Sequence, residues 1–352
     1  MLKTFEQMSE RIDSHKLMFH PHRVSDWLNG KPIYPIYVEI CLYGGCNHRC
    51  IFCSFNYTRY KPLSLDITIL KTRINNMADI GIKAIMYAGE GEPLLHKDIS
   101  FIVNHTKFKG IDVAVTTNGV MFTEEFSKRC LNSLSWVKIS MDAGKPETYA
   151  KIHGTNNKDF FRVLDNLKKS IKVRDDNHYN CVIGAQALLL PENANELHLL
   201  AIRLKEIGVD YLVIKPFTNH PYRKGNIGNL RYNELLCKVK SKLSSFESKK
   251  FKIILRDDTF KRLERKRDYK KCYSLDFWSF IDANGDVYIC SNFLKNKDYI
   301  YGNIYKESFE KIWNCRKKVD IDLSICRLIC RMDKVNQYLW ELKHLPKHVS
   351  FI

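Results

Sequence analysis

Short apolar runs alternate with longer amphipathic stretches along most of the chain, from residue 36 to residue 217. The short runs are rich in β-branched and aromatic residues and predict six strands, which begin at Ile36, Ala84, Val113, Trp136, Val182 and Tyr211. The longer stretches have the apolar spacing of helices and cover residues 67–81, 122–134, 159–174 and 195–208. Two of them end at a glycine, Gly81 and Gly208, a usual signal for the carboxyl end of a helix.

This alternation predicts an α/β fold, in which parallel strands form one sheet with helices on the outside. Six strand–helix units favour an incomplete barrel or a strongly curved sheet. In either geometry, we expect the binding and catalytic residues at the carboxyl ends of the strands.

The pattern changes on both sides of this region. Residues 1–35 are expected to form a helical lead-in and residues 36–225 the strand–helix core. Residues 226–270 are expected to be a basic helical linker, because residues 237–271 hold 14 Lys or Arg against 5 Asp or Glu. Residues 271–352 predict a small further domain, with a hairpin that turns at Asn284-Gly285.

The composition is that of a folded protein, since 45% of the 352 residues are apolar. No run reaches the ~18 apolar residues of a membrane-spanning helix, and residues 1–13 lack the apolar segment of a secretion signal. We therefore expect a cytoplasmic protein with no membrane partner. The net charge is +18, and half of it (14 − 5 = 9) lies in residues 237–271. Nucleic acid or an anionic substrate would explain this charge, but the general richness in Lys, Ile and Asn favours a biased composition.

The chain has 12 cysteines, which need a chemical explanation in a reducing compartment. Cys46, Cys50 and Cys53 lie within eight residues after the first predicted strand, so they can enclose one metal centre. A zinc ion normally takes four protein ligands, and the nearby Cys41 is expected to lie within the strand. Buried thiols are the other alternative. Three thiolates can also hold a [4Fe–4S] cluster and leave its fourth iron open to a small molecule.

This loop resembles the CxxxCxxC loop that is the hallmark of the radical S-adenosylmethionine (radical SAM) superfamily. The resemblance covers about residues 36–217 and implies a partial (β/α)6 TIM-like barrel, with a [4Fe–4S] cluster on the three cysteines and SAM beside it. Residues 89–93, Gly-Glu-Gly-Glu-Pro, are similar to the family's GGEP element, with Glu90 where a second glycine is usual. By this resemblance Glu92 and nearby backbone groups would receive the amino group of SAM.

The resemblance places further residues near SAM, most of them at strand ends. They are Phe52 in the cysteine loop, Gly89, Gly91 and Pro93 in the GGEP-like element, Thr117 and Asn118 after the third strand, Ser140 and Asp142 after the fourth, and, as weaker matches, Gln186 and Lys215. In the family, the reduced cluster gives one electron to SAM, and the resulting 5′-deoxyadenosyl radical takes a hydrogen atom from the substrate. This implies an external one-electron donor such as flavodoxin or ferredoxin.

A second group of cysteines, Cys272, Cys290, Cys326 and Cys330, resembles the twitch or SPASM extension of radical SAM enzymes. The resemblance implies one auxiliary [4Fe–4S] cluster of the twitch kind, since the full SPASM pattern needs about seven cysteines. Cys315 is a candidate fifth ligand, and a zinc ribbon of four cysteines is the alternative. Cys130, Cys181 and Cys237 are expected to be core residues.

Several substrates fit this resemblance. The residues before the barrel are too few for a peptide-recognition domain, so we expect a small polar substrate such as a sugar or cyclitol, which is oxidised or epimerised. The alternatives are a peptide or protein maturase and, less favoured, an RNA-modifying enzyme, because no RNA-binding module is found. Tyr222-Arg223-Lys224 would suit an anionic group but is interpreted as a solvated loop. No pattern identifies a catalytic base or a hydrogen-atom donor.

Overall fold

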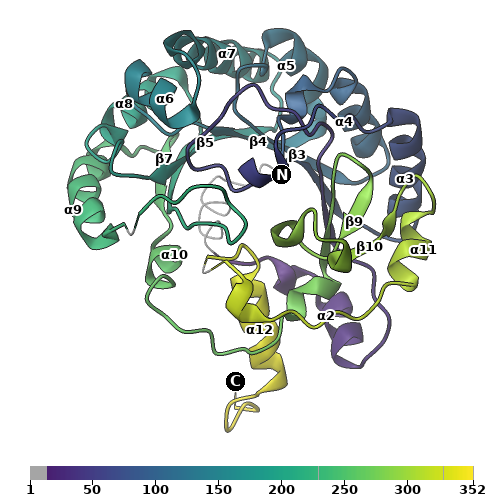
Figure 1. The fold of residues 1–352 in the computed structure, drawn as a ribbon. Helices are drawn as coiled ribbons and strands as arrows, with labels where there is room; N and C mark the ends of the chain where they lie inside the picture. Colours follow the sequence, from purple (N-terminus) through teal and green to yellow (C-terminus); the bar gives the residue numbers. More distant parts are fainter. Residues whose placement is uncertain (1–13, 229, 328, 352) are drawn as a thin grey trace.

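The computed structural model describes residues 14–228, 230–327 and 329–351 (Figure 1). The strands are β1 (Tyr37–Ile40), β2 (Ala84–Tyr87), β3 (Asp112–Thr117), β4 (Leu134–Ser140), β5 (Val182–Leu189), β6 (Tyr211–Pro216), β7 (Lys252–Leu255), β8 (Trp278–Ile281), β9 (Asp286–Tyr288) and β10 (Ile300–Asn303). The helices are α2 (Pro21–Leu28), α3 (Ile67–Asp79), α4 (Ile99–Phe108), α5 (Glu124–Cys130), α6 (Pro146–His153), α7 (Asn157–Asp176), α8 (Leu197–Ile207), α9 (Tyr232–Leu243), α10 (Asp257–Lys261), α11 (Phe309–Asn314) and α12 (Asp333–Lys343). Of the predicted lead-in, α2 is present and residues 1–13 lie outside the described residues.

One sheet runs through the molecule, in the order β10-β9-β8-β1-β2-β3-β4-β5-β6-β7. Each neighbouring pair from β8 to β7 in this order is parallel, and β9 and β10 are antiparallel additions. Helices α3 to α8 lie around the outside of the curved sheet (Figure 1). The α/β fold and all six predicted strands are thus confirmed, although within the described residues β7 and β10 remain unpaired with each other.

The sheet is longer than the sequence pattern indicates. The stretch expected to be a helical linker contains β7, which pairs in parallel with β6 from Tyr211↔Lys252 to Ile214↔Leu255. The predicted hairpin is present as β8 and β9, but β8 pairs in parallel with β1, so the hairpin extends the sheet of the barrel. Both additions depend on pairing between distant segments, which a local apolar pattern does not show.

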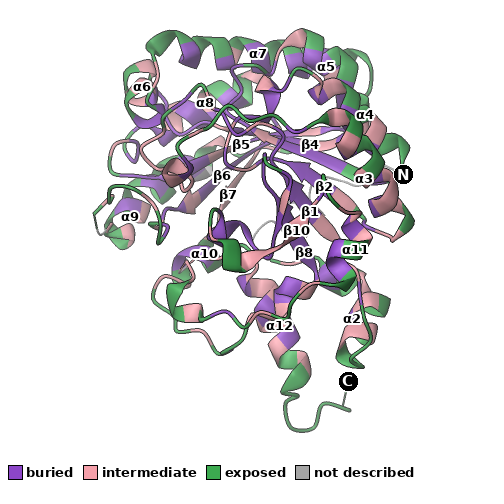
Figure 2. Ribbon diagram, turned by 45° about the vertical axis from the view of Figure 1, so that its right-hand side comes forward, coloured by how far each residue is buried: buried purple, intermediate pink, exposed green. Residues whose placement is uncertain are grey.

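The main core lies between the outer face of the sheet and the helices, where buried positions follow the strands and the inward sides of the helices (Figure 2). In α3, the buried residues Leu70, Ile74 and Met77 recur at helical spacing. Each fully buried aliphatic side chain of this kind contributes about 1.5–3 kcal/mol. Because strand side chains alternate, the other half of each strand's residues faces inward, toward the candidate site.

Candidate functional site

The cysteine loop, residues 44–54 with Cys46, Cys50 and Cys53, follows β1 and is held from behind by the end of α6. The N–H groups of Arg49 and Ile51 donate to the carbonyl oxygens of His153 and Ile152, at 3.0 and 2.9 Å. Gly154 allows this approach, since its φ is +57° and a Cβ there would lie 2.3 Å from the carbonyl oxygen of Arg49. The loop therefore takes its shape from a helix that is distant in sequence.

The three thiols of the cysteine loop are partly buried and act on one another. Burial raises the pKa of Cys50 well above its usual value, and the nearby Cys53 and Cys46 raise it further. Burial and then the charge of Glu92 raise the pKa of Cys46 to about 11. Three adjacent thiolates in such surroundings need a positive centre, because metal coordination is what makes clustered thiols ionise. This donor set fits an iron–sulfur cluster.

Two histidines that no sequence pattern had indicated, His48 and His153, lie against the same loop. A ligand atom of each of His48, Cys50 and His153 lies within 4.8 Å of the other two. However, His48 Nε2 lies 3.2 Å from Asp159, and His153 Nδ1 lies 3.5 Å from Cys50 Sγ. These contacts orient the loop and one thiol. His48 lies inside the CxxxCxxC motif, so the sequence could have indicated it. His153 lies in α6, far from the motif in sequence, so the motif could not indicate it.

The GGEP-like element approaches the cysteine loop closely through Gly91. A Cβ on Gly91 would lie 2.0 Å from the carbonyl oxygen of Tyr43 and 2.5 Å from that of Gly45. The next residue, Glu92, donates its N–H to the carbonyl oxygen of Gly45 at 2.8 Å. Glycine is therefore required at residue 91 for the two loops to touch.

The carboxylate of Glu92 is 2% exposed and is already bound by its own chain. It accepts hydrogen bonds from Thr117 Oγ1 at 2.6 Å, from the N–H of Asn118 at 2.8 Å and from the N–H of Leu94 at 3.0 Å. Burial raises its pKa to about 7, against the effect of these three donors. A carboxylate offers about four acceptor positions, so about one remains for a ligand.

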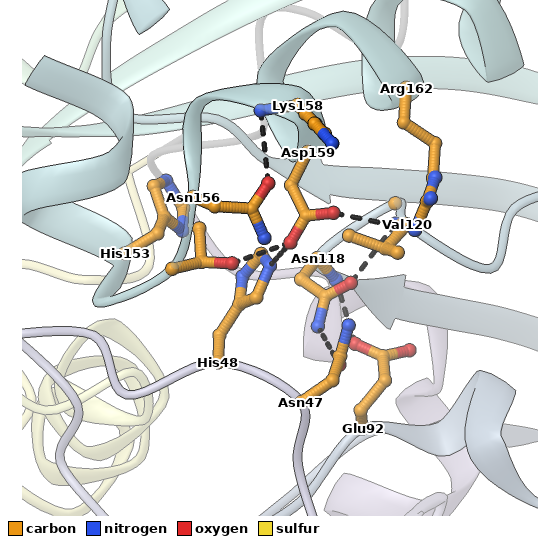
Figure 3. Close-up of polar contacts among 12 residues, drawn as sticks. Asn47, His48, Glu92, Asn118, Val120, His153, Asn156, Lys158, Asp159 and Arg162 are labelled. Atoms are coloured by element: carbon orange, nitrogen blue, oxygen red, sulfur yellow. Dashed lines mark hydrogen bonds and ion pairs between the residues drawn. The ribbon is translucent and has the colours of Figure 1, made fainter. Parts of the chain in front are cut away.

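Asn118 joins the GGEP-like element to the cysteine loop. Its N–H donates to Glu92, and its side-chain amide donates to Asn47 Oδ1 at 2.7 Å (Figure 3). The same amide nitrogen lies 4.0 Å from Cys46 Sγ. The structure thus brings together the predicted residues Cys46, Glu92, Thr117 and Asn118.

The predicted residues of the fourth and fifth strands lie side by side, with Ser140 of β4 paired to Gln186 of β5. Asp142 is 1% exposed. It accepts from the N–H of Leu188 at 2.6 Å and from Ser140 Oγ at 3.1 Å. These contacts make Asp142 a link between β4 and β5. Lys215, in β6, is half-buried at the inner face.

The remaining residues predicted near SAM contact other parts of the chain as follows. Phe52 meets the ring of His153 edge to face, with centroids 5.6 Å apart. Pro93 is buried and begins a short 3₁₀ helix (Pro93–Leu95). Gly89 has a φ of +127°, and a Cβ there would lie 2.8 Å from Cys41 Cβ.

The second group of cysteines also gathers in space. Cys272, Cys290 and Cys326 belong to one apolar cluster with the hairpin. Burial raises the pKa of Cys290 well above its usual value, and the charges of Cys330, Cys272 and Cys326 raise it further. Cys315, the candidate fifth ligand, is exposed at the end of α11. Four thiols that interact in this way suit one cluster.

Of the three cysteines expected in the core, two are buried and one is exposed. Cys130 and Cys181 are buried, as predicted, but Cys237 is exposed, so that prediction was wrong. In α9 the buried residues are Leu235, Val239 and Leu243, and Cys237 lies on another side of the helix.

Glu90, which stands where the family has glycine, ties the GGEP-like element to the hairpin region. Its Oε1 lies 3.6 Å from Lys295 Nζ, and the same ammonium lies 3.1 Å from Asp282 Oδ2. Glu90 and Asp282 are 4% and 0% exposed. Glu90 Oε2 has no hydrogen-bond partner.

The segment after β6, residues 217–225, lies beside the cysteine loop and the residues that follow it, and its Tyr222 and Lys224 are exposed, as the solvated-loop interpretation expects. Lys224 donates its N–H to Asn56 Oδ1 at 2.9 Å and accepts from Asn56 Nδ2 at 2.8 Å. Arg223 donates to the carbonyl oxygen of Ile51. The ring of Tyr57 stacks on His220, with centroids 5.2 Å apart.

Comparison with family models identifies two domains, one for each group of cysteines. Residues 40–201 match the radical SAM superfamily. Residues 272–332 match SPASM, an iron–sulfur cluster-binding domain. The chain has a radical SAM domain and a SPASM domain. The first match holds the cysteine loop and the GGEP-like element, and the second holds Cys272, Cys290, Cys326 and Cys330.

Curated relatives match only part of the chain. A probable GTP 3',8-cyclase of Methanocaldococcus jannaschii is 35% identical over 143 residues, which are 39% of this chain and 45% of that protein. A GTP 3',8-cyclase of Clostridium acetobutylicum is 31% identical over 141 residues, which are 39% of this chain and 43% of that protein. The chain therefore spans less than half the length of these relatives.

Solved structures match a larger share of this chain than the curated relatives do. SuiB of Streptococcus suis, bound to its precursor peptide SuiA, matches with a TM-score of 0.64 at 15% identity, over 84% of this chain and 68% of that chain. Native anSMEcpe with bound AdoMet matches with a TM-score of 0.57 at 17% identity, over 79% of this chain and 80% of that chain. At these identities the likeness shows the fold.

The radical SAM domain implies a [4Fe–4S] cluster and SAM, and the SPASM domain implies an auxiliary iron–sulfur cluster. The two groups of thiols described above fit these cofactors in number and in chemistry. Within the part of the chain that the structure describes, no helix combines the length and apolar character that crossing a membrane requires.

Proposed function

We propose that this protein is a radical SAM enzyme that cleaves SAM reductively and takes a hydrogen atom from a small polar substrate, which is thereby oxidised or epimerised. The observation that carries the proposal is the contact between the cysteine loop and the GGEP-like element, through Gly91, Glu92 and Asn118. It supports one site in which a cluster and SAM would meet.

In this proposal Cys46, Cys50 and Cys53 hold the SAM-binding cluster, and the four cysteines of the SPASM domain hold the auxiliary cluster. When bound, the first cluster would supply the one electron that cleaves the S–C5′ bond of SAM, with methionine and a 5′-deoxyadenosyl radical as the products. A protein donor of the flavodoxin or ferredoxin kind would supply that electron.

In this proposal, the chain's own residues bind SAM, orient it and keep water out of the site. The free acceptor position of Glu92 suits the ammonium of SAM, and Thr117 and Asn118 hold that carboxylate in place. Phe52 packs within the site, and Arg223 of the segment 217–225 contacts the cysteine loop at Ile51, which supports exclusion of water from the loop. Ser140, Gln186 and Lys215 face inward and would contact SAM or substrate.

A peptide substrate is the second candidate. A cavity of about 730 Å³ adjoins the end of β6 and is lined by Phe217, Tyr232 and Phe260 among others. Polar and charged residues such as Asn219, Arg231 and Glu234 complete the lining, and a cavity of this size with both kinds of side chain suits a peptide segment. The small-molecule proposal is preferred because the relatives named for GTP match in sequence, whereas SuiB matches in fold.

The proposal is tested by anaerobic reconstitution, iron counting and measurement of 5′-deoxyadenosine. Two clusters would give about eight irons per chain. The triple variant Cys46→Ala/Cys50→Ala/Cys53→Ala should keep about four irons and lose SAM cleavage, whereas the exposed Cys237→Ala should match the unmodified protein. Cleavage of SAM by the triple variant would show the proposal to be wrong.

A further inference from the structure

Two lysines stand on the inner face of the sheet, on β4 and β6. In β4, Val137 and Ile139 are fully buried against the helices, so Lys138 between them points inward. In β6, Ile214 is fully buried on the outer side, and its neighbour Lys215 points inward. Both lysines are half-buried.

Three arginines lie near Lys215, and two of them also act on Lys138. Arg256 follows β7, and its N–H donates to the carbonyl oxygen of Ile214 at 3.0 Å. Arg327 and Arg331 come from the SPASM domain. Arg327 donates to the carbonyl oxygen of Thr218, three residues beyond Lys215, at 3.4 Å, and the charges of Lys138, Arg256, Arg327 and Arg331 all act on Lys215.

The two lysines and Arg327 lack a carboxylate partner within the described residues. Glu39 of β1 is 1% exposed and faces inward, but Arg331 forms an ion pair with it. Lys138, Lys215 and Arg327 form no ion pair with any carboxylate in residues 14–228, 230–327 and 329–351. Lys138 has instead the ring of Trp136, 5.1 Å from its Nζ. Arg327 Nε is buried without a hydrogen-bond partner.

Cations in this position cost free energy unless a counter-charge compensates them. Burial and then the neighbouring cations lower the pKa of Lys138 to about 8 and that of Lys215 well below its usual value. A phosphate carries up to two negative charges and accepts several hydrogen bonds, so it matches three cations better than a single carboxylate does.

We propose that Lys138, Lys215 and Arg327 form a phosphate-binding site on the inner face of the sheet, which holds a phosphate group of the substrate. This inference rests on the proposed function, and it narrows the small polar substrate to a phosphorylated or nucleotide-type molecule. The other anion that could meet Lys215 is the methionine carboxylate of SAM.

The test measures binding of two probes, inorganic pyrophosphate and SAM, to the anaerobically reconstituted full chain. Pyrophosphate affinity is taken from the rise in Tm with ligand concentration, and SAM affinity from equilibrium dialysis. The variants are Lys138→Met and Lys215→Met, and the matched control is Lys249→Met, at an exposed lysine. Methionine keeps the length of the apolar stem, so both inner-face variants should fold.

We expect pyrophosphate to raise the Tm of the unmodified protein and of Lys249→Met. In Lys138→Met and in Lys215→Met its affinity should fall about tenfold or more, while SAM affinity stays within about twofold. Equal pyrophosphate affinity in all four proteins would overturn the proposal. So would a loss of SAM affinity alone in Lys215→Met, which would assign the lysine to the SAM carboxylate. Loss of SAM cleavage with this pyrophosphate response intact would refute the proposed function and leave the phosphate site standing.

Discussion

Replacing Gly91 by alanine tests whether the contact between the GGEP-like element and the cysteine loop organises the site. The new Cβ would lie 2.0 Å from the carbonyl oxygen of Tyr43, 2.5 Å from that of Gly45 and 2.7 Å from the carbonyl carbon of Gly44. Ordinary contact begins at 3.4 Å, so the loops must separate by about 3.4 − 2.0 = 1.4 Å. All three neighbours are backbone atoms, so no side chain can rotate away.

The expected cost has two parts. Overpacking of this kind costs about 1–3 kcal/mol, and loss of the hydrogen bond from Glu92 N–H to Gly45 costs about 1 kcal/mol. The sum of about 2–4 kcal/mol should lower the Tm by about 4–8 °C, at about 2 °C per kcal/mol for a chain of this size. Because Cys46 follows Gly45 directly, SAM affinity and iron content should fall as well.

The assay is anaerobic thermal unfolding of reconstituted protein, with iron counting and SAM equilibrium dialysis on the same samples. Gly228→Ala is the matched control, since a Cβ there has no heavy atom within 4 Å and the residue has no positive φ. A Gly91→Ala protein with the Tm, iron content and SAM affinity of Gly228→Ala would refute the reasoning. A lower Tm with full SAM affinity would show that the contact supports the fold without organising the site.

Three further predictions follow from the contacts of the two domains. Lys295→Met leaves Glu90 buried without its cation and should cost about 1–3 kcal/mol in thermal unfolding. The double variant Glu90→Gln/Lys295→Met should recover part of this loss, and purely additive losses would contradict the ion pair. Cys330→Ala should lose about four irons while SAM cleavage by the first cluster persists, whereas Cys315→Ala should keep all iron. Gly154→Ala should lower iron content, since a Cβ there meets the backbone of the cysteine loop at 2.3 Å, and unchanged iron would contradict the supporting role of α6.

The sequence predicted the six barrel strands and the hairpin because each has its own apolar pattern and turn signal. Gly81 and Gly208, for example, have φ of +83° and +93°, as expected of helix ends. The four residues of β7 lie in a lysine-rich stretch, and what makes them a strand is the pairing with β6. The parallel pairing of β8 with β1 joins segments that are far apart in sequence, so no local pattern contains it.

For the site, motif spacing predicted which residues gather but not what they contact. Glu92 and Asp142 were expected beside SAM, and both carboxylates are largely bound by the chain's own donors. The partner of Cys50, His153, comes from α6, in a segment that the motif does not cover. A sequence motif records residue types, whereas hydrogen-bond saturation depends on how distant strands and helices meet.

The net charge of the chain is a further case in which the sequence alone does not show where residues lie in the fold. Half of the +18 lies in residues 237–271, most of which were expected to be a basic helical linker. In the structure, that stretch contains β7, and Arg256 just beyond it acts on the inward-facing Lys138 and Lys215. A short parallel strand thus carries part of the basic run to the inner face of the sheet. The overall charge says little about the substrate, because most of it is exposed, whereas the few cations that pairing brings inward restrict which substrate can bind there.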